Sequence, residues 1–223
     1  MEIVVIRRRF LSSTIVLAAG LALDGCIIVK TPNKRVVGAD DANSDSFDPG
    51  AMVSAIWDSK VIPYLSTKAG PLPEVVALAR SNPDEAGRKF GYRAKEGSEP
   101  WTYVVKIDGR VVSADTASRA GTIGVDTGGD GKVAAIVQIG PAMRGTALRD
   151  SLDFVSFNDF KNQIDYAQFG KAFNQHVVKT VLSKLPRDSL VGRKVSVLGA
   201  FTLDTGDQPP LVAPVQLTLG PAS

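Results

Sequence analysis

Two kinds of apolar spacing alternate along the chain and predict a sheet interrupted by one long helix. Strand-like runs rich in valine and isoleucine occupy five segments: 102–115, 122–126, 133–139, 194–203 and 211–219. Asp108-Gly109 divides the first segment, and this pair fits either a hairpin or a bulge in one long bent strand. The run at 133–139 is strongly apolar, so we expect that strand to be buried.

The long helix is expected at residues 159–185, between the third and the fourth strand. Its apolar residues recur mostly every four positions, which predicts one stripe that faces a core. The stripe consists of Phe160, Ile164, Phe169, Phe173, Val177, Val181 and Leu185. Ser156 or Asn158 is the expected N-cap, and Pro186 follows the last turn.

Helical spacing also precedes the first strand. Asp48 can cap a helix that Pro63 should kink or end. Two shorter helices are expected at 73–80 and 83–90, each with a proline at its start. Trp57 lies at helical spacing with its apolar neighbours, which favours a core position over an exposed ring that stacks on a sugar.

The predicted order of elements is three strands, one helix and two strands. A five-stranded Greek-key barrel of the OB type places its helix between strands three and four. We therefore predict an α+β fold, an OB-like five-stranded small β-barrel preceded by a small helical region. An open sheet with the helix on one face is the alternative, because element order alone does not require closure. The expected organisation is a signal peptide at 1–25, a tether at 26–46, the helical region at 47–98 and the barrel domain at 99–223.

The N-terminal segment predicts a cellular location. Three arginines at 7–9 precede an apolar run at 10–23, which is shorter than the roughly twenty residues that span a bilayer as a helix. The chain's only cysteine, Cys26, ends the sequence LDGC, which resembles the lipobox at which bacterial lipoproteins are cleaved and acylated. Asp24 departs from that pattern. We expect Cys26 to carry lipid, palmitate included, on the periplasmic side of the envelope, and an uncleaved anchor with a buried cysteine is the alternative.

Composition narrows the possible functions. The formal net charge of +3 falls to about +2 without the first 25 residues, so no concentrated basic patch is available for nucleic acid. His176 is the only histidine and there is no second cysteine, so we expect no metal and no cofactor. Asp126 and Asp130 resemble a fragment of a calcium loop, but a glycine-rich turn between two strands explains them. No nucleophile elbow or carboxylate pair can be assembled, and no catalytic residue is predicted.

The most informative polar segment is 140–150, a loop between the third strand and the long helix. Its guanidinium groups can form forked hydrogen bonds with a carboxylate of a ligand or partner. Polar helix residues three and four apart can face this loop, and an arginine before the second strand can join the same surface. The candidate binding residues are Arg144, Thr146, Arg149, Asp150, Asn162, Gln163, Tyr166 and Arg119. The alternative is an internal pair between Arg149 and Asp150.

Several short motifs make the chain similar to a known bacterial family. They are Cys26, WDSK at 57–60 with VIP at 61–63, IGP at 139–141, RGTALRD at 144–150, FNDF at 157–160 with NQ at 162–163, YA at 166–167 and PV at 214–215. With them the chain resembles predicted periplasmic lipoproteins built from one domain of unknown function. The resemblance implies an envelope location and a lipid anchor. Members are often encoded near sugar ABC transporters, which implies an accessory role, and no catalytic residue transfers.

Two main classes of function follow. The first is a lipid-anchored binding or accessory module, not an enzyme, that serves a sugar or other solute ABC transporter and touches the membrane through its lipid. The second is an envelope enzyme that acts on a glycan or an ester through residues that the sequence does not assemble. In a third, a purely structural envelope protein, the loop at 140–150 has no ligand.

Overall fold

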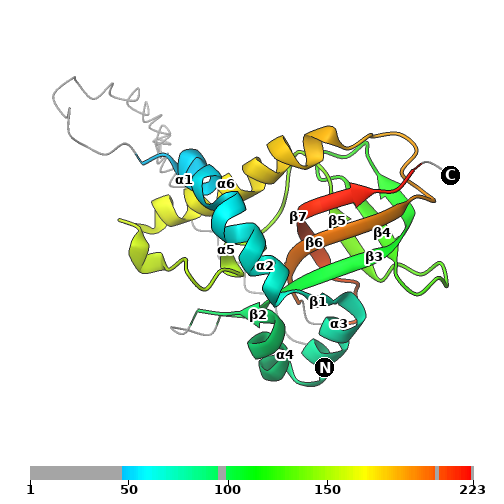
Figure 1. Cartoon of the computed structure of the whole chain (residues 1–223), viewed down its shortest axis with the longest axis horizontal. Coiled ribbons are helices and arrows are strands. Elements are labelled where there is room, and N and C mark those ends of the chain that lie inside the picture. Colours follow the sequence, from blue (N-terminus) through cyan, green and yellow to red (C-terminus); the bar gives the residue numbers. More distant parts are fainter. Residues whose placement is uncertain (1–46, 95–98, 204–205, 222–223) are drawn as a thin grey trace, which may run out of the picture. The chain divides into compact units, whose positions relative to one another are not determined.

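The computed structural model describes residues 47–94, 99–203 and 206–221 (Figure 1). Its centre is a barrel of five strands, β3 (Thr102–Asp115), β4 (Thr122–Asp126), β5 (Ala135–Gln138), β6 (Lys194–Thr202) and β7 (Leu211–Leu219). Neighbours pair in the order β3, β4, β5, β7 and β6, and β6 pairs back onto β3. The barrel is therefore closed. The predicted OB-like barrel is confirmed, and the open-sheet alternative is wrong.

β3 is the strand on which the barrel closes. It pairs with β6 from Thr102 opposite Thr202 onward, and its second half pairs with β4. The register with β4 shifts between Val111 and Ser113, which marks a bulge. β3 continues without a break through Asp108-Gly109, so one long strand is confirmed and the hairpin is wrong; the bulge expected at this pair lies instead between Val111 and Ser113.

Two very short strands were not predicted. β1 (Gly70–Pro71) pairs parallel with β3, and β2 (Gly91–Tyr92) pairs with it antiparallel. Two residues are too few to carry a periodic pattern, so the sequence gives no sign of them. Both join the helical region to the first half of β3.

The helical region contains the three predicted helices. α1 (Pro49–Ile56) begins where the Asp48 carboxylate accepts the Ala51 backbone N–H at 2.9 Å. α3 (Leu72–Ser81) and α4 (Pro83–Phe90) match the predicted ranges to within one residue at each end. Local capping and proline at the first turn thus position these helices.

The helical run continues past Pro63 because a π-helical turn precedes the proline. Trp57–Val61 forms a π-helical turn, and the Ile62 N–H donates to the Trp57 carbonyl. α2 (Ile62–Lys68) follows, with Pro63 in its first turn, where the missing N–H costs little. The expectation that Pro63 ends the helical run is therefore wrong, because the helix continues through it to Lys68.

The long helix is shorter than predicted. α6 (Gln163–Thr180) starts at the Asn162 cap, and a 3-10 turn, η3 (Leu182–Lys184), follows its end. Ser156 caps a separate 3-10 turn, η2 (Phe157–Asp159), which occupies the predicted helix start. The start at residue 159 is therefore wrong, because two successive polar caps break the run.

The apolar stripe of α6 faces the core only after its first turn. Phe169, Phe173 and Val177 are buried, whereas Ile164 is 67% exposed. Ile164 was predicted to belong to the buried stripe, and this is wrong. The buried residues of α6 begin at Phe169, so its first turn lies outside the core.

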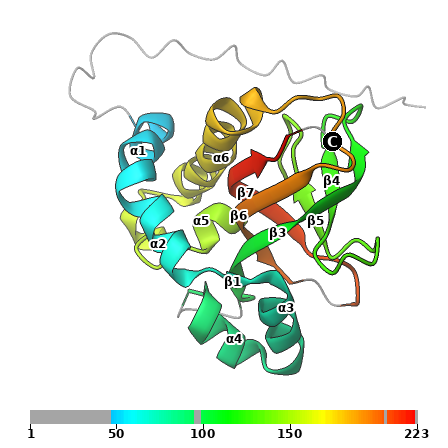
Figure 2. The same ribbon diagram turned by 45° about the vertical axis from the view of Figure 1, so that its right-hand side comes forward.

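The helices and the barrel share one hydrophobic core. α1 packs along α6 on one side of the barrel (Figure 2). Trp57, Phe173 and Phe201 belong to the same buried cluster, so the core position predicted for Trp57 is confirmed. None of the helices in the described ranges is long and apolar enough to cross a bilayer. The predicted signal peptide, the tether and Cys26 lie outside the described residues, and the domain boundary between residues 98 and 99 stays a prediction.

Candidate functional site

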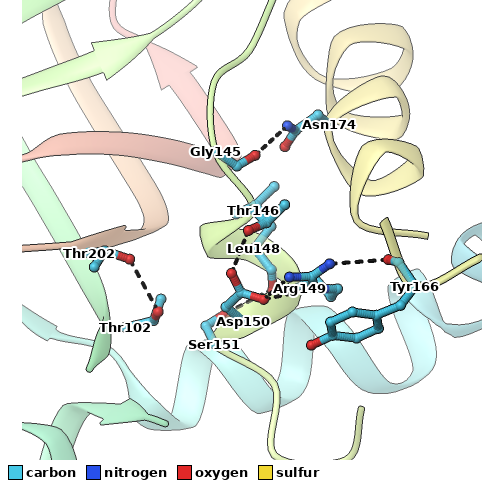
Figure 3. Close-up of polar contacts among 10 residues, drawn as sticks. All are labelled: Thr102, Gly145, Thr146, Leu148, Arg149, Asp150, Ser151, Tyr166, Asn174 and Thr202. Atoms are coloured by element: carbon cyan, nitrogen blue, oxygen red, sulfur yellow. Dashed lines mark hydrogen bonds and ion pairs between the residues drawn. The ribbon is translucent and has the colours of Figure 1, made fainter. Parts of the chain in front are cut away.

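The loop predicted as a site ends in one short helix, α5 (Ala147–Asp150), that carries an ion pair (Figure 3). Nε of Arg149 donates to Oδ1 of Asp150 at 2.7 Å, and a terminal guanidinium nitrogen lies 2.5 Å from the same oxygen. The hydroxyl of Thr146 donates to Oδ2 at 2.5 Å. Both carboxylate oxygens are thus bonded by the protein itself, and the internal pair considered as the alternative is present.

Helix α6 holds Arg149 from the other side. A terminal nitrogen donates to the Tyr166 backbone carbonyl at 3.1 Å, and the guanidinium carbon lies 3.7 Å from the centre of the Tyr166 ring. Gly170 permits this approach, because a Cβ there would lie 2.9 Å from the guanidinium. Asn174 donates to the Gly145 carbonyl at 2.9 Å, which fastens the loop to the same helix (Figure 3). The Arg149 side chain is only 10% exposed as a result.

A pocket of about 650 Å³ opens beside this ion pair. Its walls come from residues 92–94 and 99–100, the ends of β3 and β6, α5 with the following loop, and the first turn of α6. The lining includes the rings of Tyr92, Phe157 and Tyr166 and the polar groups of Thr102, Thr202, Ser156 and Gln163. Aromatic faces and neutral hydrogen-bonding groups therefore lie in one concave surface.

The pocket lining contains two cationic and two anionic side chains, so its formal charge is zero. Arg149 pairs with Asp150, and Arg93 lies 3.4 Å from the carboxylate of Asp84. Glu99 is the remaining charged residue of the lining. Burial raises the pKa of Tyr166 above its ordinary value, although the nearby Arg149 charge opposes this shift, so the phenol stays neutral at physiological pH.

Four of the eight candidate residues line the pocket, namely Arg149, Asp150, Gln163 and Tyr166. Thr146 supports them through its bond to Asp150. The Asn162 side chain is occupied as the cap of α6, where it accepts two backbone N–H bonds.

The other two candidates, Arg144 and Arg119, do not belong to the pocket lining. The Arg144 N–H donates to the buried Gln138 side chain at 2.7 Å, and its own side chain is exposed. The Arg119 carbonyl accepts the Ala142 N–H at 2.9 Å. Both arginines make these contacts through their backbone atoms. The expectation that their side chains lie on the same surface as Arg149 has no support in the pocket lining.

Sequence comparison assigns the family. The profile of the predicted periplasmic lipoproteins called DUF2291 matches residues 16–218. The chain belongs to this family. The expected location of the lipoprotein, anchored by lipid on the periplasmic side of the envelope, is confirmed by this membership, and the association with sugar transporters is a separate matter that it does not address. None of the curated proteins matches the lipoprotein.

A solved structure independently resembles the lipoprotein's fold. A crystal structure of an OB-fold protein from Thermotoga maritima is similar at a TM-score of 0.61 and 19% sequence identity. The match covers 78% of the lipoprotein and 98% of the other chain. At this identity the likeness extends to the fold alone.

Several pocket residues of the lipoprotein escaped the sequence analysis. Tyr92, Thr102 and Thr202 come from strand ends that are distant in sequence, and only barrel closure brings them beside α5. Gly170 gave a usable signal, because a glycine inside a helix often marks a close approach. That signal was available in the printed sequence between Phe169 and Lys171.

The remaining polar candidates of the lipoprotein have structural explanations. The Asp126 carboxylate accepts backbone N–H bonds from Gly128, Gly129 and Gly131 at 2.7 to 2.8 Å, as a turn between β4 and β5 requires. His176 packs its ring 4.4 Å from that of Trp57, and burial lowers its pKa. Within the described ranges, no group of three or more histidine, cysteine or acidic side chains is arranged to hold a metal.

Proposed function

We propose that this lipoprotein is a non-catalytic binding module that takes a small, neutral, polar solute into the pocket beside Arg149. Its lipid keeps it at the membrane, where it serves a solute uptake system such as an ABC transporter. A sugar is the ligand class that the lining fits best. Aromatic rings of the lining, such as those of Tyr92 and Phe157, can pack against the apolar face of a sugar ring, while amides and hydroxyls bond its hydroxyl groups.

The internal bonding of the charged pair is the observation that carries this proposal. Arg149 gives hydrogen bonds to Asp150 and to the Tyr166 carbonyl, so its charge is already neutralised. An incoming anion would have to compete with a carboxylate that is fixed in place. A neutral solute needs no such exchange and can use Gln163 together with the remaining lone pair of Oδ2 of Asp150.

The enzyme alternative uses the same pocket and is less well supported by its geometry. A general acid or base must exchange a proton during the reaction. Both Asp150 oxygens accept hydrogen bonds from protein side chains, and the Tyr166 phenol has a raised pKa. These groups favour fixed hydrogen bonding over proton transfer.

Gln163 offers the cleanest test. It lines the pocket, is exposed and lies at the first position of α6, where alanine is a good helix former. Titration calorimetry of the full chain in detergent with a panel of monosaccharides should find at least one ligand. Gln163→Ala should raise the dissociation constant of that ligand about tenfold, which corresponds to the loss of one good hydrogen bond.

Gln168→Ala is the matched control, because Gln168 is an exposed glutamine on the same helix outside the pocket lining. It should bind as the unaltered protein does. Small carboxylates belong in the same panel. Tight binding of a carboxylate with no sugar bound would overturn the neutral-solute proposal, and equal weakening by both glutamine variants would move the ligand away from this pocket.

A further inference from the structure

Three neighbouring strands bring three pocket residues into one row. Tyr92 of β2 lies opposite Thr102 of β3, and Thr102 lies opposite Thr202 of β6. Residues that are directly opposite each other on antiparallel strands project from the same face of the sheet. All three residues line the pocket. Backbone pairing, rather than a loop, therefore positions this part of the pocket wall.

The residues next in sequence agree with this direction. Tyr103 and Leu203 line a different cavity, of about 610 Å³, because successive side chains of a strand point to opposite faces. On the side of the pocket, the hydroxyl oxygens of Thr102 and Thr202 lie 3.3 Å apart (Figure 3). We call these two residues the threonine pair. It brings two hydroxyls to the end of the barrel that borders the pocket.

The threonine pair has unused capacity for hydrogen bonds. Two hydroxyls together hold two donors and four lone pairs. Their mutual bond of 3.3 Å is longer than the usual O–H···O distance of about 2.7 to 2.8 Å, and it occupies one donor and one lone pair. The two hydroxyls make no other hydrogen bond to the described residues. One donor and three lone pairs therefore remain.

Burial makes this capacity unusual. Four polar or charged residues are buried in the described ranges, namely Thr102, Asp126, Gln138 and Ser151. The last three each make a bond of 2.7 to 2.9 Å to a backbone group. Thr102 is only 3% exposed, yet it has only the long bond to Thr202. Buried polar groups are normally well paired, so a partner that enters from the pocket is expected here.

We infer that the threonine pair determines the specificity of the pocket by binding a hydroxyl group of the solute. This inference rests on the proposed function of the pocket. A solute hydroxyl both donates and accepts, so it can use the free donor and a free lone pair, whereas a carboxylate can use only the donor. A methylene at the same place would leave a buried hydroxyl without a partner, which is costly. The pair therefore selects a polyol such as a monosaccharide against its deoxy analogue.

Titration calorimetry of the full chain in detergent tests this selection with monosaccharides and their monodeoxy analogues. One deoxy analogue of the best-bound sugar should bind the unaltered protein at least about tenfold more weakly than the sugar itself. Thr202→Val conserves the shape and removes the hydroxyl, so it should bind the sugar and this analogue equally well. Thr102→Val should behave in the same way. Thr202→Ser keeps the hydroxyl and should keep the discrimination.

Thr218→Val is the matched control, because Thr218 is an exposed threonine of β7 outside the pocket lining. It should bind both sugars as the unaltered protein does. A lower urea midpoint of Thr202→Val with unchanged discrimination would make the pair a structural contact between β3 and β6 and overturn the inference. Sugar binding that no deoxy analogue weakens would overturn the inference and leave the proposed function standing. Absence of sugar binding by the unaltered protein would overturn both.

Discussion

At the scale of single residues, the protein holds the charged groups beside its pocket in fixed positions. The Arg149 guanidinium is bonded to Asp150 on one side and stacked on Tyr166 on the other. Arginine suits this position because its planar fork can bond a carboxylate and lie on an aromatic ring at the same time. The residue thus joins α5 to α6 and shapes the pocket without being free to bind.

Replacing Arg149 should therefore reduce stability before it affects any ligand. Arg149→Ala leaves Oδ1 of Asp150 and the Tyr166 carbonyl without the Arg149 donor and should lower the free energy of unfolding by about 1.5 to 3 kcal/mol, the range for hydrogen bonds to charged groups. Arg149→Lys should recover only part, since an ammonium cannot make both contacts. Urea unfolding measures the free energy of unfolding of both variants. The combined Arg149→Ala and Asp150→Ala variant should lose less of this free energy than the sum of the losses of the two single variants. Additive losses would mean that the two residues act independently.

Asp126 predicts an acid dependence of stability. Backbone N–H bonds, that from Gly131 first and then those from Gly129 and Gly128, hold the pKa of its carboxylate below the ordinary value near 3.9. The folded state therefore gains stability from this group above about pH 4 and loses it as the pH falls through the lowered folded pKa. Asp126→Asn should unfold at lower urea at pH 7 and show a shallower loss of stability below about pH 4. Parallel pH profiles for the two proteins would contradict this assignment.

At the scale of elements, the barrel strands depend on close backbone approach. Gly109 in β3 lies against β4, and a Cβ there would sit 2.3 Å from the Asp126 carbonyl oxygen. Gly199 in β6 is similar, with the Ala213 carbonyl oxygen at 2.6 Å. The register of β6 with β7 also shifts at Gly199, and both glycines let neighbouring strands approach closely in a small barrel.

Gly109→Ala should consequently push β3 away from β4 and cost about 1 to 3 kcal/mol, the usual range for overpacking. Gly128→Ala is the control, because a Cβ at Gly128 would meet nothing closer than 3.8 Å. Thermal unfolding followed by circular dichroism compares the two. Similar midpoints for both variants would show that β3 tolerates a side chain at position 109.

Elements with strong local signals were predictable from the sequence. β4, β7 and α4 have their predicted ranges, because alternating or capped patterns specified both of their ends. The start of α6 was wrong, since Ser156 and Asn162 both cap and only tertiary packing decides which helix continues. The pocket could be located in part, through α5 and α6, while its barrel residues depended on pairings between distant strands.

At the scale of the whole molecule, one core unites the helical region and the barrel. Trp57 from the helical region touches Phe173 of α6, with ring centres 6.1 Å apart, and Phe173 is fully buried. A shared core couples the two parts energetically, so neither exposes its apolar surface without the other. The sequence could not reveal this, because it gives the stripe of each helix and not the surface that covers it.

Unfolding should accordingly be a single transition. Helix content measured by circular dichroism and the fluorescence of Trp57 and Trp101 should change at the same urea concentration. Phe173→Ala should lower both midpoints together, with a loss of about 3 to 5 kcal/mol, whereas the exposed Phe154→Ala should cost about 1 kcal/mol or less. Two separate midpoints would instead support independent domains on either side of residue 98.

The pairing of β3 with β6, which closes the barrel, also affects when the chain can fold. Thr102 and Thr202 face each other across β3 and β6 although 100 positions separate them in the sequence. Pairings of such high contact order form slowly, because a long loop must close before any of its contacts is gained. Synthesis and early export therefore involve a polypeptide that has not yet closed its barrel, a state compatible with threading through a narrow translocation channel. Assembly is delayed until nearly the whole sequence has reached the periplasm.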